Sequence, residues 1–139
     1  MNSIIKNILA LIGGGLVGMV ANMGLIVTGN QLIPFSDNIN PMDAMNWELK
    51  YFIFPFLAHA IGTLLGAFIA SKFSANYHML FAMSIGIFFL SGGISMVFIL
   101  PAPIWFIVVD LVLAYIPMGW LGWEINNLIT KPTSPILPS

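Results

Sequence analysis

Cysteine and arginine are both missing from this 139-residue chain, and charge of either sign is scarce. Without cysteine, the chain has no disulfide, no thiolate catalysis, no cysteine zinc site and no iron–sulfur cluster. The four lysines form no basic cluster, so the sequence predicts no nucleic-acid partner. Charged residues make up 6% of the chain, against about 25% in a typical globular domain.

Apolar side chains dominate what is present, since 59% of the residues are hydrophobic. A soluble domain of this length cannot bury so much apolar surface, because small domains have a high ratio of surface to volume. Four apolar runs are long enough to cross a membrane at about 20 residues per helix, and they cover residues 4–28, 51–71, 77–99 and 104–123. None alternates as a membrane β-strand does. The sequence predicts an all-α polytopic membrane protein, a four-transmembrane-helix bundle in a single domain.

The lysines give the predicted orientation. With the N-terminus in the cytoplasm, one lysine lies outside and three lie inside, namely Lys50 outside and Lys6, Lys72 and Lys131 inside. The positive-inside rule therefore favours an N-in, C-in arrangement. The first run is longer than the apolar core of a cleavable signal peptide, so we expect it to be retained as a span. The proline-rich tail, residues 130–139, is expected to be flexible.

The long outer loop, residues 29–50, contains a signal for the start of a helix. Asn40, Pro41 and Asp43 are typical of an N-cap, a first-turn proline and a first-turn acid. One interpretation is a helix that runs from here into the second span and is kinked at Pro55. The other is an ordinary interfacial loop.

Small residues recur at every fourth position in the first two spans. The first span carries Ala10, Gly14, Gly18 and Asn22, and the second carries Ala58, Gly62, Gly66 and Ala70. Such stripes let helix backbones approach closely in a membrane. We predict that the four glycines are packing positions, either against each other within one chain or against a second copy.

Each span also contributes a polar side chain at a similar depth in the outer half of the membrane. At about 1.5 Å of rise per residue, these groups lie roughly 9–13 Å below the outer surface. They form one polar layer of Asn22, His59, Ser91, Ser95 and Asp110. Ionisable groups at this depth are costly in lipid and are functional-site candidates by default.

Three interpretations of the polar layer stay open. In the first, Asp110 and His59 pair or share hydrogen bonds with Asn22 and the serines, which fixes the faces where the helices meet. In the second, the layer is the floor of an outward-facing cavity that binds a small molecule or a lipid headgroup. In the third, Asp110 and His59 relay protons or a cation.

We predict no cofactor and no metal site. His59 and His78 lie near opposite membrane faces, which does not suit bis-histidine haem within one monomer. His59 and Asp110 supply fewer than the three ligands expected of a zinc site. Neither serine of the polar layer lies in a nucleophile elbow, so we do not expect an enzyme. A membrane-embedded enzyme acting on lipid is a further alternative.

Three segments carry a resemblance. They read FPFLAHAIGTLLG over residues 54–66, LPAPIWFIVVD over 100–110 and YIPMGWLG over 115–122. In these runs the chain resembles short four-span bacterial membrane proteins of uncharacterised function. The resemblance implies the four-helix build and a location in the bacterial inner (cytoplasmic) membrane. It implies no activity, substrate or cofactor.

These features predict a small integral membrane scaffold or accessory subunit, acting in a homo-oligomer or a larger membrane complex. Its partners would be membrane lipids and itself or other membrane subunits. The alternative is a small transport or ligand- or lipid-binding protein that uses the polar layer. An outward cavity that reaches Asp110 would favour the alternative, and an oligomer packed through the glycine stripes would favour the scaffold.

Overall fold

A computed structural model describes residues 1–132, and every regular element within them is helical. The α-helices are α1 (Ser3–Leu32), α2 (Ile53–Phe73), α3 (His78–Ile99), α4 (Ile104–Leu113) and α5 (Ile116–Thr130). In this part of the chain, the stretches long and apolar enough to cross a membrane are Ser3–Leu32, Leu49–Phe73, His78–Ile99 and Ile104–Thr130. The predicted all-α fold with four spanning stretches is therefore confirmed. Most of the predicted tail, residues 133–139, lies outside the described residues.

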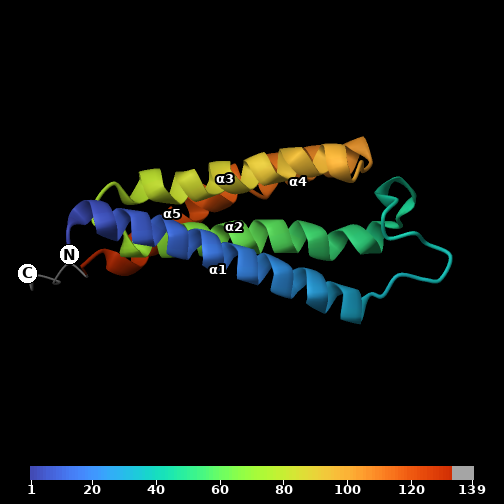
Figure 1. The fold of residues 1–139 in the computed structure, drawn as a ribbon, viewed down its shortest axis with the longest axis horizontal. Helices are drawn as coiled ribbons and strands as arrows, with labels where there is room; N and C mark the ends of the chain where they lie inside the picture. Colours follow the sequence, from blue (N-terminus) through green and yellow to red (C-terminus); the bar gives the residue numbers. More distant parts are fainter. Residues whose placement is uncertain (133–139) are drawn as a thin grey trace, which may run out of the picture.

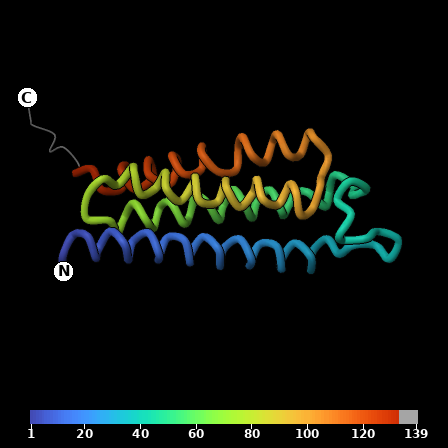
Figure 2. The backbone as a smooth tube through the Cα atoms, turned by 45° about the horizontal axis from the view of Figure 1, so that its top comes forward, coloured from blue at the N-terminus to red at the C-terminus, as the bar shows by residue number. Residues whose placement is uncertain are grey.

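The helices lie lengthwise in an elongated bundle, with the start of α1 and the end of α5 at one end, here called the terminal end, and the long connection at the other (Figure 1). Figure 2 shows the same arrangement from a second direction. Asn7 joins the start of α1 to the turn between α2 and α3, because its Oδ1 accepts from the Ala75 backbone N–H at 2.7 Å and its Nδ2 donates to Asn76 Oδ1 at 2.8 Å. This contact holds the ends of three helices together at the terminal end.

The two glycine stripes pack against each other within the chain. A Cβ atom on Gly14 would come 2.5 Å from the Gly66 carbonyl oxygen, and one on Gly18 would come 2.8 Å from the Gly62 carbonyl oxygen. The reverse placements are equally close, with a Cβ on Gly66 at 2.7 Å from the Gly14 oxygen. Only glycine allows the backbones of α1 and α2 to approach this closely, so the stripes are occupied by an intramolecular contact.

Glycines also seat α5 against α2 and α3. A Cβ on Gly122 would lie 2.7 Å from the Leu64 carbonyl oxygen of α2. Gly119 of α5 faces Gly86 of α3, where an added Cβ would come 3.4 Å from the Gly86 Cα. Between these contacts lies a buried core of small and branched residues, Ala67, Ala70, Ala82 and Ile85.

The outer loop is not a continuous helix into the second span. It contains two short 3-10 helices, Ala44–Asn46 and Leu49–Phe52, separated by extended residues. Asn40 does organise the predicted start, because its Oδ1 accepts from the Met42 backbone N–H at 2.9 Å. The prediction of a kink at Pro55 is wrong, because α2 begins at Ile53. Pro55 therefore lies in the first turn, where its missing N–H leaves no helical bond unmade.

The fourth spanning stretch is broken in the middle. Its first part, α4, ends at Leu113, and α5 begins at Ile116 with Pro117 in its first turn. A proline ring clashes with the carbonyl four residues earlier, which here belongs to Leu113. Tyr115 at the break has φ −120° and ψ −74°, outside the helical range. Pro117 thus redirects the chain between the two halves of the span.

Candidate functional site

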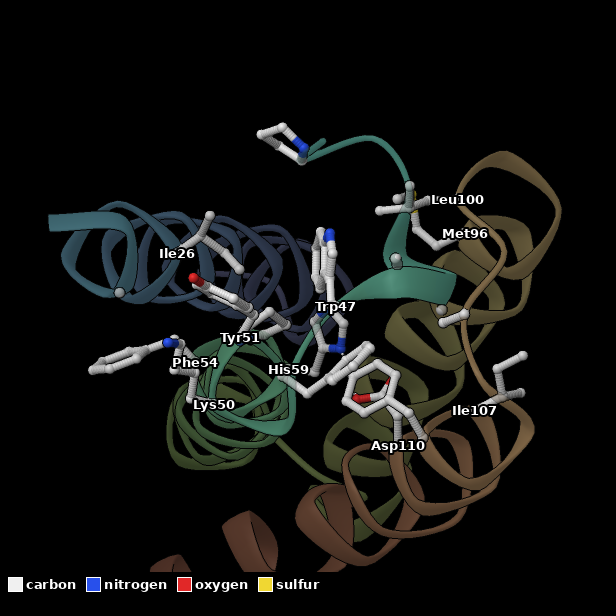
Figure 3. Close-up of a pocket in the computed structure, with 18 of the residues that line it drawn as sticks. Ile26, Trp47, Lys50, Tyr51, Phe54, His59, Met96, Leu100, Ile107 and Asp110 are labelled. Atoms are coloured by element: carbon white, nitrogen blue, oxygen red, sulfur yellow. Dashed lines mark hydrogen bonds and ion pairs between the residues drawn. The ribbon is translucent and has the colours of Figure 1, made fainter. Parts of the chain in front are cut away.

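A cavity of about 310 Å³ lies at the end of the bundle that carries the outer loop. Its walls come from the ends of α1 and α3 and from the starts of α2 and α4, where the bundle opens out (Figure 1). Figure 3 shows the side chains that surround it, among them Trp47 of the loop, His59 of α2, and Ile107 and Asp110 of α4. Most of the lining is apolar, and its polar side chains include Asn30, Lys50, His59 and Asp110.

His59, Asp110 and Tyr115 form a connected polar group at the floor of this cavity, referred to below as the triad. His59 Nδ1 lies 2.8 Å from Asp110 Oδ1, and the Tyr115 hydroxyl donates to Asp110 Oδ2 at 3.0 Å. The Tyr115 ring also stacks on the His59 ring, with centroids 5.7 Å apart. Asp110 is 5% exposed, so its carboxylate is held almost entirely by these two partners.

The helix break and a glycine together create room for this group. Residues five positions apart lie about 140° around the axis of an unbroken helix, so Tyr115 would point away from Asp110. The break before Pro117 removes that constraint. Across the interface, a Cβ on Gly93 of α3 would lie 2.5 Å from the Tyr115 hydroxyl oxygen. Gly93 therefore leaves the space that the tyrosine fills.

Aromatic rings form the roof above the triad. Phe35 of the loop stacks on Tyr51 at 4.6 Å between centroids and contacts Trp47 at 4.9 Å. Trp47 in turn contacts Phe52 at 5.3 Å, and Phe52 contacts Phe106 of α4 at 4.5 Å. Ring pairs of this kind contribute about 0.5–1.5 kcal/mol each beyond their burial. The loop is thus held over the cavity by contacts that run from the loop to α4.

The structure brings together only part of the predicted polar layer. His59 and Asp110 meet, whereas Asn22 lies at the close α1–α2 contact, where a Cβ on Gly62 would be 3.1 Å from its Cβ. Ser91 and Ser95 are exposed and donate to carbonyl oxygens of their own helix, those of Phe88 and Ser91. Of the first interpretation, the pairing of His59 and Asp110 is present, whereas the serine hydroxyls bond carbonyl oxygens of α3 instead of Asp110.

Sequence reasoning missed Tyr115 and a second polar network near the terminal end. In that network, Asn126 Nδ2 donates to the Ser71 hydroxyl at 3.0 Å, and the Ser74 hydroxyl lies 2.8 Å from His78 Nδ1. Both serines are buried, and the network joins α2, α3 and α5. For Tyr115, the signal in the sequence was Pro117 two residues later, which predicts a break that frees the tyrosine from the helical register.

No protein-family model, no curated protein sequence and no solved structure matches this chain. Its class therefore rests on the fold and the composition. Four apolar spanning helices with 6% charged residues define a small multi-pass integral membrane protein. A cavity at one end of the bundle, with a buried aspartate at its floor, distinguishes this protein from a plain four-helix anchor.

Proposed function

We propose that this protein binds a small amphipathic molecule in the cavity at the loop end of the bundle. The observation that supports the proposal is that a cavity of about 310 Å³ reaches the triad, an ionisable group inside the membrane. Ligand sites are mostly apolar cavities with a few convergent polar groups, and this cavity has that composition. The volume suits one ring-sized group at the small end of the usual range.

Binding is better supported than conduction through the bundle. Around Tyr115 of the triad, the interior is filled by Ala60 and Ala114, which are both buried. Farther toward the terminal end, the core of Ala67, Ala70, Ala82 and Ile85 follows. Close packing of this kind favours a binding site over a wet path for a proton or cation from Asp110 to the other face.

The scaffold or accessory role stays a prediction, and the glycine stripes no longer favour it. The glycine stripes that motivated it are used between α1 and α2 of the same chain. The remaining exposed apolar faces are those that any membrane span presents to lipid. We also propose that the cavity faces outward, since Lys6 lies near the start of α1 and Lys72 near the end of α2, both at the terminal end of the bundle. A location in the bacterial inner membrane is proposed on the resemblance of residues 54–66, 100–110 and 115–122 alone.

A matched pair of tryptophan substitutions tests the binding proposal. Ile107 lines the cavity, whereas its neighbour Val108 is 54% exposed on the outside of α4. Native mass spectrometry of the protein released from nanodiscs should detect a bound small molecule in the wild type and in Val108→Trp. Ile107→Trp fills the cavity and should lose that molecule. A wild type without a bound molecule, or equal retention by both variants, would contradict the proposal.

A further inference from the structure

The triad restricts what the cavity can recognise. Both oxygens of Asp110 are used, Oδ1 by His59 Nδ1 and Oδ2 by the Tyr115 hydroxyl. Within the described chain, Nε2 of His59 has no hydrogen-bond partner, and His59 lines the cavity. Nε2 is therefore the polar atom through which the triad can contact an occupant. If Nε2 carries a hydrogen, the occupant must offer a hydrogen-bond acceptor. If it does not, the occupant must offer a donor.

An electrically neutral His59–Asp110 pair always carries that hydrogen. If the proton shared by the pair lies on His59, the ring is an imidazolium and both ring nitrogens carry hydrogen. If it lies on Asp110, the acid donates to Nδ1, and the neutral ring keeps its hydrogen on Nε2. Only a pair with a net negative charge leaves Nε2 bare, and an uncompensated charge is expensive inside a membrane. The neutral pair is thus the form that presents a hydrogen-bond donor to the cavity, and the inference is built on this form.

Among residues 1–132, no lysine lies against Asp110. Lys50 is the other charged side chain in the lining, and its Nζ lies 3.2 Å from Glu48 Oε2 at the exposed rim. The charges of Lys50 and Glu48 therefore balance each other, and Lys50 does not balance the charge of a ligand. An anionic ligand would then bring a charge that the cavity does not balance. The occupant should instead be neutral and should carry a hydrogen-bond acceptor.

The walls indicate the shape of the group that carries the acceptor. Phe52, Phe106 and Trp47 line the cavity with Phe35, and the His59 ring is backed by the stacked Tyr115 ring. Flat aromatic surfaces pack best against a flat ring. About 310 Å³ holds one such ring system but not a whole two-chain lipid.

We infer that the cavity binds the head ring of a membrane-dissolved quinone, with a ring carbonyl oxygen accepting a hydrogen bond from His59 Nε2. This inference rests on the proposed function, because it names the class of molecule that the cavity takes. The ester carbonyl of a lipid offers the same acceptor, and the experiment below separates the two sources. No redox step is required of the protein, which recognises the quinone through one hydrogen bond and the aromatic walls.

Binding of radiolabelled decylubiquinone to nanodisc-embedded protein tests the inference, with empty nanodiscs subtracted. We expect saturable binding to the wild type and to Val108→Trp, and its loss in Ile107→Trp. His59→Asn keeps a side-chain amide where Nδ1 meets Asp110 but removes the Nε2 donor. It should weaken binding about tenfold, the size expected for the loss of one hydrogen bond.

The outcomes separate this inference from the proposed function. Unchanged affinity in His59→Asn would overturn the role of Nε2 as donor. Displacement of the quinone by an excess of a short-chain phosphatidylcholine would indicate that the acceptor is a lipid ester carbonyl. This result would contradict the inference that the ligand is a quinone. Absence of quinone binding would also overturn it, but the proposed function would stand if Ile107→Trp still loses a co-purifying molecule. Quinone binding that Ile107→Trp leaves intact would overturn both.

Discussion

The hydroxyl of Tyr115 donates a hydrogen bond to Oδ2 of Asp110 across a break in the span that carries both residues. The two side chains would point in different directions on a continuous helix, so the bond depends on the break that precedes Pro117. Gly93 completes the arrangement from α3, because any side chain there would occupy the place of the tyrosine hydroxyl. A proline and a glycine that contribute no polar atom therefore position the buried carboxylate.

Removing the hydroxyl at this position should destabilise the fold. Tyr115→Phe leaves Asp110 Oδ2 buried without a donor while it keeps the ring stacked on His59. We expect the free energy of unfolding to fall by about 1–2 kcal/mol. Unfolding by SDS in mixed micelles measures this loss. Tyr77→Phe is the control, because Tyr77 is exposed and should change the free energy very little. Equal effects of the two substitutions would contradict the role of the hydroxyl.

The pair of His59 and Asp110 should be energetically coupled. A double-mutant cycle with His59→Ala, Asp110→Ala and both together should give a coupling energy of about 1–3 kcal/mol, because the pair is largely removed from water. The free energies come from the same micelle titration.

The exposed pair of Lys50 and Glu48 provides the comparison for that cycle. Its atoms are 3.2 Å apart, but both side chains are close to half exposed or more. Its coupling should be much smaller than that of His59 and Asp110, because solvent screens an exposed ion pair. A coupling at His59 and Asp110 no larger than this would mean that the triad does not act as a unit.

Neighbouring glycines in α1 should respond in opposite ways to alanine. Gly14→Ala places a methyl group 2.5 Å from the Gly66 carbonyl oxygen, so α1 and α2 must separate, at a cost of about 1–3 kcal/mol. Gly15→Ala meets nothing within 4 Å and should leave the free energy of unfolding unchanged or raise it. A variant with Gly15→Ala as damaging as Gly14→Ala would show that α1 packs through another face.

The hydroxyl of Thr63 should be dispensable. Thr63 is 1% exposed, and its Oγ1 has no hydrogen-bond partner in the described part of the chain. Thr63→Val keeps the shape and removes an unsatisfied polar atom, so the protein should be as stable as the wild type or more stable by up to about 1 kcal/mol. Thr63→Ser keeps the hydroxyl and loses a methyl group, and it should be less stable. Thermal unfolding in detergent ranks the three proteins. A clear loss of stability in Thr63→Val would reveal a partner for the hydroxyl.

The sequence predicted the spans and the close-packing faces of α1 and α2 because both depend on local patterns. Apolar runs identify the spans, and a stripe of small residues such as Gly14 and Gly18 identifies a face for close packing. The pattern could not say which surface meets that stripe, since a second stripe in the same chain and a second copy present the same small residues. The pairing of Gly14 with Gly66 needed the three-dimensional arrangement.

The site was less predictable, because it depends on rotation about the helix axes. Equal depth placed Ser91, Ser95, His59 and Asp110 in one layer, but depth alone does not say which way a side chain points. The serines turn away from the triad and bond their own helix, as isolated hydroxyls in membrane helices readily do. Tyr115 reaches Asp110 because the helix is broken before Pro117. On a continuous helix the two side chains would point in different directions.

Nitrogen-15 NMR of the His59 ring in lipid nanodiscs reports both the hydrogen on Nε2 and its contact with an occupant. We expect Nε2 to carry hydrogen in the wild type and its signal to move when decylubiquinone is added. The signal should stay in place in Ile107→Trp, where the cavity is filled. A bare Nε2, or a signal that does not respond to quinone in the wild type, would contradict the claim that the triad presents a donor to a molecule bound in the cavity.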